Sequence, residues 1–124
     1  MKIVVVEDEP SLSDALKDKL TRSGFDVSVV RNGDEAIETI RKVKPDIVSL
    51  DLLLPKKNGY KVLEELKEDV ELKLIPVVVM SNLGEDEDIK KCLKLGAEDY
   101  FVKSQHPIGE IVEKLKSVVL QKSR

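Results

Sequence analysis

The stretch IVVVEDEP, residues 3–10, decides how this chain folds. Four aliphatic residues, all branched at Cβ, run directly into three acidic residues and a proline. A continuous aliphatic run of this kind is typical of a strand buried on both faces of a parallel sheet. We therefore predict a buried strand at residues 3–6, with acidic side chains where it ends.

Outward from this stretch, strand-like runs alternate with helical patterns along the whole chain. Strands are predicted at residues 3–6, 27–30, 46–50, 75–80 and 99–103, and each is followed by apolar residues at helical spacing. Such alternation predicts a parallel sheet with helices on both faces. Five strands are too few for a closed eight-stranded barrel. The expected fold is an open, doubly wound α/β sheet in a single domain, residues 1–124.

Composition narrows the classes of function. The chain has 41% hydrophobic and 36% charged residues, which excludes disorder. No apolar stretch approaches the roughly 20 residues of a membrane span. The net charge is −3 and no basic block stands out, so direct nucleic-acid binding has little support. We expect a cytoplasmic protein that neither enters the membrane nor contacts nucleic acid directly.

Cys92 and His106 are the only cysteine and histidine. They exclude an internal disulfide and a zinc site with several Cys or His ligands. Ile89, Cys92 and Leu93 are predicted to form the narrow apolar face of the helix at 85–95, with Cys92 as a small core residue. His106 is predicted to be a surface loop residue, so a hydrolase built on Cys92 or His106 is disfavoured. Any bound metal must be held by oxygen ligands.

Polar side chains stand where four of the predicted strands end. Glu7 and Asp8 follow the first strand, Asp51 the third, Ser81 the fourth and Lys103 the fifth. Ligands of open α/β sheets bind beyond the carboxyl ends of the strands. Clustered carboxylates repel one another by up to about 4 kcal/mol at ~4 Å, and Mg²⁺ and an amine supply the countercharge. Such a site is suited to hold a phosphoryl group, with Asp51 as the nucleophile.

Taken alone, each of these residues has an ordinary structural explanation. A carboxylate after a strand is usually a helix cap or a solvated loop residue, and Ser81 is usually a turn or cap residue. Lys103 alone is a surface lysine. The coincidence of polar residues at four strand ends is what favours the chemical interpretation.

Five segments, in order, resemble the receiver domain of two-component response regulators. They are VVVEDEP (4–10), PDIVSLDLLLP (45–55), NG (58–59), IPVVVMS (75–81) and GAEDYFVK (96–103), and they span essentially the whole chain. The resemblance implies the flavodoxin-like (βα)5 fold with strand order 2-1-3-4-5. It also implies a stand-alone receiver of the chemotaxis-regulator type, with no output domain.

The resemblance implies a complete phosphorylation site. Asp51 is the implied phosphoacceptor. The implied Mg²⁺ ligands are the carboxylates of Glu7, Asp8 and Asp51 and the backbone carbonyl of Leu53, and the implied phosphoryl contacts are Ser81 and Lys103.

The resemblance also implies a switch and its partners. Movement of the Ser81 hydroxyl toward the phosphate lets Tyr100 turn inward, which remodels the face made by the last strand and the helices on either side of it. The implied phosphodonor is a sensor histidine kinase, a phosphotransfer protein or a small molecule. A downstream protein of unknown identity binds the remodelled face of a monomer, and whether activation causes dimerisation stays open.

Three positions depart from the pattern of the family. Glu7 stands where aspartate is commoner, and Asn82, where the family favours a small residue, is expected to narrow access to the phosphoryl group. Ser104 follows Lys103 where the family has a proline in a cis linkage. A cis peptide bond before a non-proline residue costs about 2.5–4 kcal/mol, so the Lys103–Ser104 bond is predicted to be trans.

Leu53 and Leu83 stand where, in the family, side chains flank the path of the hydrolytic water. Because neither can orient water, we expect a long-lived phosphorylated state.

Two other functions compete with the switch. A phosphate-independent pseudo-receiver conflicts with the complete set of site residues. An aspartyl-phosphate phosphatase needs a second aspartate two residues after the nucleophile, and position 53 is leucine.

Overall fold

The computed structural model describes residues 1–122 as five successive βα units. The strands are β1 (Lys2–Val6), β2 (Asp26–Val30), β3 (Ile47–Leu50), β4 (Val77–Ser81) and β5 (Asp99–Val102). The helices are α1 (Pro10–Arg22), α2 (Gly33–Val43), α3 (Gly59–Glu68), α4 (Asp86–Leu95) and α5 (Ile108–Lys122), and the 3-10 turn η1 (Lys103–Gln105) follows β5. Each predicted strand is present, with bounds that differ from the prediction by at most two residues. The central strands are continuous aliphatic runs, which are typical of strands buried on both faces.

The five strands form one parallel sheet in the order β2-β1-β3-β4-β5, as the resemblance implied. Val6 of β1 pairs with Leu50 of β3, so these two strands end at the same level. Ser81 of β4 pairs with Val102 of β5 in the same way. The residues that follow these strand ends are therefore brought to one edge of the sheet.

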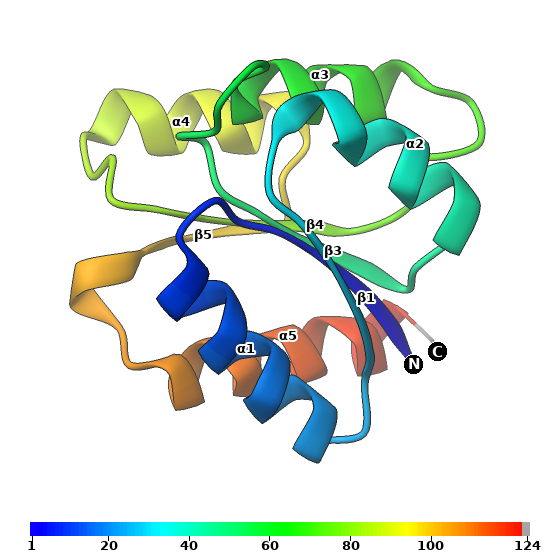
Figure 1. Cartoon of the computed structure of the whole chain (residues 1–124). Helices are drawn as coiled ribbons and strands as arrows, with labels where there is room; N and C mark the ends of the chain where they lie inside the picture. The colour runs from blue at the N-terminus through cyan, green and yellow to red at the C-terminus, as the bar shows by residue number, and fades with distance from the viewer. Residues whose placement is uncertain (123–124) are drawn as a thin grey trace.

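Helices cover both faces of the sheet: α1 and α5 lie on one side, and α2, α3 and α4 on the other (Figure 1). Alternate residues of β1 serve the two layers. Val4 and Val6 belong to the core beneath α2, α3 and α4, whereas Ile3 and Val5 belong to the core beneath α1 and α5. All four side chains are at most 1% exposed, because successive side chains of a strand point to opposite faces.

Two asparagines fix where helices begin at the functional edge. The side chain of Asn58 accepts a 3.0 Å hydrogen bond from the N–H of Lys61 at the start of α3. Asn32 caps α2 through the N–H of Glu35 in the same way. Each cap satisfies a backbone donor that has no partner within its helix, so the loop from β3 to α3 has a fixed end.

Helix α4 is held to the core by little of its surface. Cys92 is its only fully buried residue, which confirms Cys92 as a core residue. The sequence also places Leu93 on the apolar face, but Leu93 is 46% exposed. That assignment is wrong because adjacent residues lie about 100° apart around a helix, so burying Cys92 turns Leu93 outward. A helix with so few buried contacts can shift at small cost.

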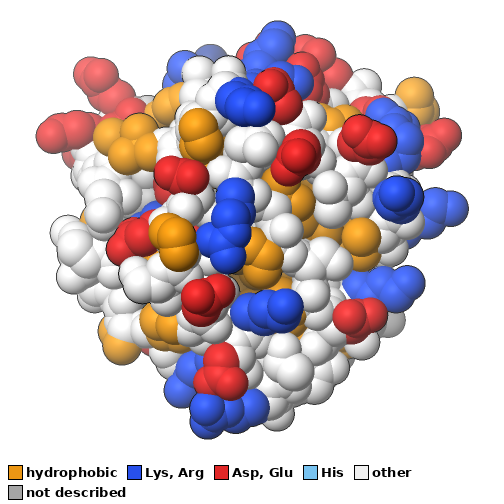
Figure 2. Space-filling view, in the orientation of Figure 1, with side chains coloured by type: hydrophobic (Ala, Val, Ile, Leu, Met, Phe, Trp, Pro, Cys, Tyr) orange, Lys and Arg blue, Asp and Glu red, His pale blue; other side chains and the backbone are white. Residues whose placement is uncertain are grey.

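Charges of both signs are mixed over the surface. On the face drawn in Figure 2, the Lys and Arg side chains are interspersed with Asp and Glu side chains rather than gathered into a patch of one sign. Within residues 1–122, the helices all lack the length and apolar character that crossing a bilayer requires.

Candidate functional site

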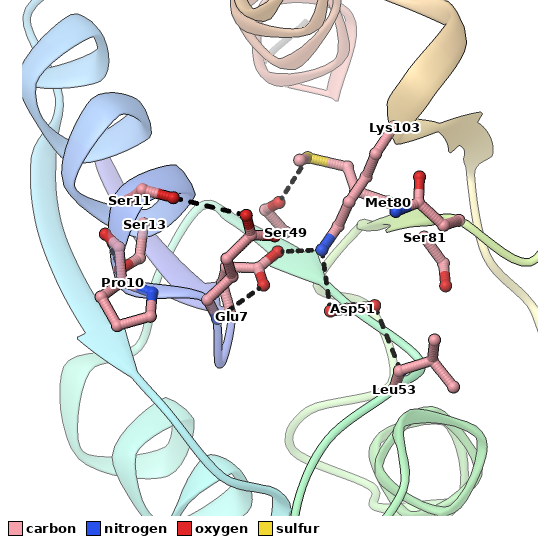
Figure 3. A network of polar contacts seen from close by, with 12 residues as sticks. Glu7, Pro10, Ser11, Ser13, Ser49, Asp51, Leu53, Met80, Ser81 and Lys103 are labelled. Atoms are coloured by element: carbon pink, nitrogen blue, oxygen red, sulfur yellow. Dashed lines mark hydrogen bonds and ion pairs between the residues drawn. The ribbon is translucent and has the colours of Figure 1, made fainter.

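The ammonium group of Lys103 lies between two carboxylates at the carboxyl edge of the sheet (Figure 3). Its Nζ is 2.6 Å from Oε1 of Glu7 and 2.9 Å from Oδ2 of Asp51. The side chains of Glu7, Asp51 and Lys103 are only 2%, 6% and 11% exposed. Three residues that are far apart in the sequence therefore form one nearly buried ionic cluster, as their places at the strand ends predict.

Burial and pairing oppose each other in this cluster. Burial raises the pKa of Glu7, and the hydrogen bond from Lys103 counteracts part of that rise. Burial by itself would lower the pKa of Lys103, but its bonds to Glu7 and Asp51 outweigh burial and raise that pKa. With both carboxylates ionised, one ammonium group leaves an excess negative charge that attracts a further cation.

A small cavity of about 210 Å³ opens beside the cluster. Glu7, Asp8, Asp51, Leu53, Asn82 and Lys103 are among its lining residues, and Asp8 is exposed there. Among residues 1–122, no three acidic, histidine or cysteine side chains are grouped tightly enough to hold a metal ion as they stand. The oxygen donors and the excess negative charge suit Mg²⁺, which keeps several waters and needs few protein carboxylates.

The loop after β3 holds Asp51 in place. The N–H of Leu53 donates a 3.1 Å hydrogen bond to Oδ1 of Asp51, and the N–H of Gly59 donates a 2.8 Å bond to the carbonyl of Leu52. A Cβ atom at position 59 would lie 2.3 Å from the backbone oxygen of Asp51. The Asn58-Gly59 pair thus caps α3 and lets that helix begin directly against the loop.

Ser81 and Tyr100 lie on neighbouring strands close to the cluster. Ser81 is fully buried, and Tyr100 is 9% exposed. The hydroxyl of Tyr100 donates to the carbonyl of Leu83, and burial raises the pKa of Tyr100 to about 12, so the hydroxyl keeps its proton at neutral pH. Tyr100 is therefore already turned inward here, while Lys103 is paired with Asp51.

The turn after β5 follows a different path from the one the family pattern implies. The Lys103–Ser104 peptide bond is trans, as predicted. The N–H of Ser104 donates a 3.2 Å hydrogen bond to Oδ1 of Asn82, at the end of β4. Sequence reasoning assigned Asn82 only to narrowing access, and it missed this bond. The available clue was that both bonded residues depart from the family pattern.

Comparison with known proteins identifies the family. The model of the response regulator receiver domain matches residues 3–116. The chain belongs to the response regulator receiver domains. A receiver domain is the regulatory, phosphorylation-dependent switch of two-component signalling, and response regulators interact with sensor histidine kinases or phosphotransfer proteins.

Relatives and solved structures agree with this assignment. The receiver is 38% identical over 118 residues to the probable transcriptional regulator ycf27 of Pyropia yezoensis, which covers 95% of this chain and 47% of that protein. The BeF3-activated receiver domain of Klebsiella pneumoniae RstA matches with a TM-score of 0.88 and 33% identity, covering 96% of this chain and 98% of that one. The Mn²⁺-bound form of response regulator Rcp1 gives a TM-score of 0.83 and 29% identity, with 94% and 91% covered.

The receiver spans about half the length of the curated relatives it matches. The expectation of a stand-alone domain without an output domain therefore stays a prediction.

Cys92 and His106 lie outside the ionic cluster and the cavity beside it. Burial raises the pKa of the Cys92 thiol to about 11, which makes it a poor nucleophile at neutral pH. The His106 ring packs edge-on against Phe101, with ring centroids 4.9 Å apart, and its Nδ1 is 2.9 Å from Oε1 of Glu110. Neither residue lines the cavity beside Asp51.

Proposed function

We propose that this receiver is switched by transfer of a phosphoryl group to Asp51, with Mg²⁺ as the cofactor and a sensor histidine kinase or phosphotransfer protein as the donor. The observation that carries the proposal is the buried Glu7–Lys103–Asp51 cluster beside a cavity. Burying two carboxylates against one ammonium costs stability. A phosphorylation site accounts for that cost, and the phosphate-independent alternative does not.

In the proposed reaction, a carboxylate oxygen of Asp51 attacks the phosphorus atom of the donor. A P–O bond to Asp51 forms as the bond between phosphorus and the leaving group breaks, and the leaving group takes the electron pair. Glu7, Asp8, Asp51 and the backbone carbonyl of Leu53 would hold Mg²⁺, which when bound neutralises charge on the phosphoryl oxygens.

Two further residues contact the transferred group in this proposal. Lys103 can exchange its carboxylate partners for a phosphoryl oxygen, because its flexible stem carries a compact charge. The buried hydroxyl of Ser81 donates a hydrogen bond to another phosphoryl oxygen. Both interactions stabilise the charge on the phosphoryl group, which is the main contribution a protein makes to such a transfer. The domain thereby assists its own phosphorylation.

The response is proposed to pass through Ser81 and Tyr100 to the surface formed by α4, β5 and α5, where a downstream protein binds. Support comes from the weak burial of α4, in which only Cys92 is fully buried. The absence of a one-sign patch on the drawn face and the net charge of −3 give no support to nucleic-acid contact by these residues. What a longer protein of this family binds is a separate question.

The central test is phosphorylation by a small acyl phosphate. We expect mass spectrometry to find one added phosphoryl group when the protein is incubated with the donor and Mg²⁺, and none when EDTA replaces Mg²⁺. Asp51→Asn removes the attacking carboxylate and is expected to abolish the modification. Asp99→Asn, at a carboxylate of β5 outside the cavity, is the matched control and should be modified like the wild type. Modification of Asp51→Asn would refute the proposal.

The lifetime of the phosphorylated state gives a second prediction. The side chain of Leu53 is 56% exposed and lines the cavity, yet it cannot orient a water molecule. We propose that Leu53 and Leu83 prolong the phosphorylated state because their apolar side chains do not orient the water that attacks the phosphoryl group. Leu53→Glu is expected to speed the loss of phosphate about tenfold by orienting the attacking water.

Loss of phosphate is followed by removing the donor and measuring the remaining phosphoprotein over time. Leu120→Glu is the matched control, because Leu120 is 57% exposed and does not line the cavity. Equal rates for Leu53→Glu and the wild type would count against the proposal. Leu53 is a better test position than Leu83, which is half-buried. A charged side chain at the exposed position 53 does not disturb packing.

A further inference from the structure

The turn that carries Lys103 is held by a hydrogen bond that a proline at position 104 would rule out. Proline has no N–H group and disfavours a helical conformation in the residue before it. Here Lys103 begins the 3-10 turn η1, and the N–H of Ser104 donates to Oδ1 of Asn82. Position 104, where the family pattern has proline, thus holds a serine whose backbone N–H donates a hydrogen bond. Position 82, where the family favours a small residue, holds the asparagine that accepts it.

This hydrogen bond joins the segments that follow β4 and β5, directly beside Lys103. Ser81, directly before Asn82, pairs with Val102, directly before Lys103. The bond from the N–H of Ser104 to Asn82 continues the connection past the end of the β4–β5 ladder. The residue before Lys103 is therefore fixed by the sheet, and the residue after it is fixed by Asn82.

Fixing both neighbours of Lys103 determines where its long side chain can reach. Its ammonium group lies within 3 Å of both Glu7 and Asp51. Asn82 and Lys103 both line the cavity beside Asp51 and the adjoining hollow of about 380 Å³, which Ser104 also lines. A loosened turn would let Lys103 move into these open spaces and away from the carboxylates.

We propose that Asn82 is a positioning residue for Lys103: its side-chain carbonyl holds the N–H of Ser104 and so keeps the Lys103 ammonium at Asp51. The inference rests on the proposed function, in which that ammonium stabilises the incoming phosphoryl group. Asn82 makes no contact with the reacting atoms in this scheme, and it acts only through Lys103.

The first test compares phosphorylation rates with a small acyl phosphate at saturating Mg²⁺. Asn82→Ala is expected to slow phosphorylation about three- to tenfold, the range that the loss of one hydrogen bond allows. Asn32→Ala removes a similar exposed asparagine bond, 3.0 Å long, at the start of α2. This control is expected to be phosphorylated at the wild-type rate. Equal rates for Asn82→Ala and the wild type would overturn the inference.

The second test asks whether Asn82 acts through Lys103. Lys103→Ala is expected to retain a slower, Mg²⁺-dependent reaction, because the carboxylates remain. In that background Asn82→Ala is expected to have no further effect, since interacting residues are not additive. A second three- to tenfold loss in the absence of Lys103 would show that Asn82 has a different role and would overturn the inference.

A third measurement is independent of phosphorylation. The side-chain ¹⁵N resonance of Lys103, observable while the ammonium is held in ion pairs, is expected to broaden or disappear in Asn82→Ala and to persist in Asn32→Ala. Persistence of the resonance in Asn82→Ala would refute the positioning role even if no variant accepts phosphate. Failure of the wild type to accept phosphate at Asp51, with the resonance behaving as expected, would refute the proposed function alone.

Discussion

A Lys103→Met variant is expected to be about 3 kcal/mol less stable than the wild type at pH 7 without Mg²⁺. Methionine fills a similar volume but leaves Glu7 and Asp51 facing each other with no countercharge. Both carboxylates are nearly buried, at 2% and 6% side-chain exposure, so water cannot screen their repulsion well. Removing one partner of a buried ionic network is among the most damaging single changes.

The loss of stability depends on pH in a defined direction. Burial raises the pKa of Glu7 and the hydrogen bond from Lys103 opposes that rise, so removing Lys103 raises the pKa further. A carboxyl group with a raised pKa in the folded state binds more protons folded than unfolded. The stability of Lys103→Met therefore falls as the pH rises from about 4.3, the ordinary glutamate pKa, to the raised pKa of Glu7. The difference in unfolding free energy between this variant and the wild type should be largest above that pH range.

Urea unfolding at pH 7 and at pH 4, with and without Mg²⁺, checks both statements. Added Mg²⁺ is expected to recover part of the lost stability, because an ion that binds only the folded state stabilises it. Lys114→Met is the matched control: Lys114 pairs with Asp99 at 3.3 Å, with side chains 41% and 38% exposed, and such surface pairs contribute about 0–1 kcal/mol. If Lys103→Met were as stable as Lys114→Met at pH 7, then repulsion between the unpaired carboxylates of Glu7 and Asp51 would not destabilise the fold, and the prediction would be wrong.

The sheet could be predicted from the sequence because its three central strands, β1, β3 and β4, are buried on both faces. Ile3–Val6 and Val77–Met80 are continuous aliphatic runs, and the structure buries every residue in them. The order of the strands in the sheet, by contrast, could not be predicted from the sequence pattern. Alternating strands and helices are compatible with several orders, and the family resemblance supplied the order. Which apolar residues of α4 are buried was harder still to predict. Cys92 and Leu93 are adjacent in the sequence, yet Cys92 is buried and Leu93 is exposed.

The site was predictable only as far as strand ends determine it. Glu7 and Asp51 meet because β1 and β3 end level, with Val6 paired to Leu50. β5 runs two residues past that level, and the long side chain of Lys103 spans the difference to complete the cluster. The bond from Ser104 to Asn82 depends on the path of a short turn, and no periodicity encodes such a path. Neither does the sequence indicate that Tyr100 points inward, since a strand aromatic is compatible with either position.

A Gly59→Ala variant is expected to lose about 3 kcal/mol of stability, and its melting temperature should fall by about 10 °C. The added Cβ would lie 2.3 Å from the backbone oxygen of Asp51 and 2.5 Å from the Cα of Leu52. Both are backbone atoms, so no side-chain rotation relieves the overlap. The loop carrying Asp51 must move away from α3, or the start of α3 must unwind and break the 2.8 Å bond from Gly59 to Leu52.

Either movement displaces the phosphoacceptor, so Gly59→Ala is also expected to be phosphorylated more slowly at a temperature where it is still folded. Gly84→Ala is the matched control, because its added Cβ would meet only the side chain of Val102 at 3.6 Å, an ordinary contact. Calorimetry and phosphorylation by a small acyl phosphate separate the two consequences. If Gly59→Ala melted and reacted like Gly84→Ala, the close packing of α3 against the Asp51 loop would not be what holds the acceptor in place. A lower melting temperature with an unchanged rate would show that the loop keeps its position and that α3 alone absorbs the strain.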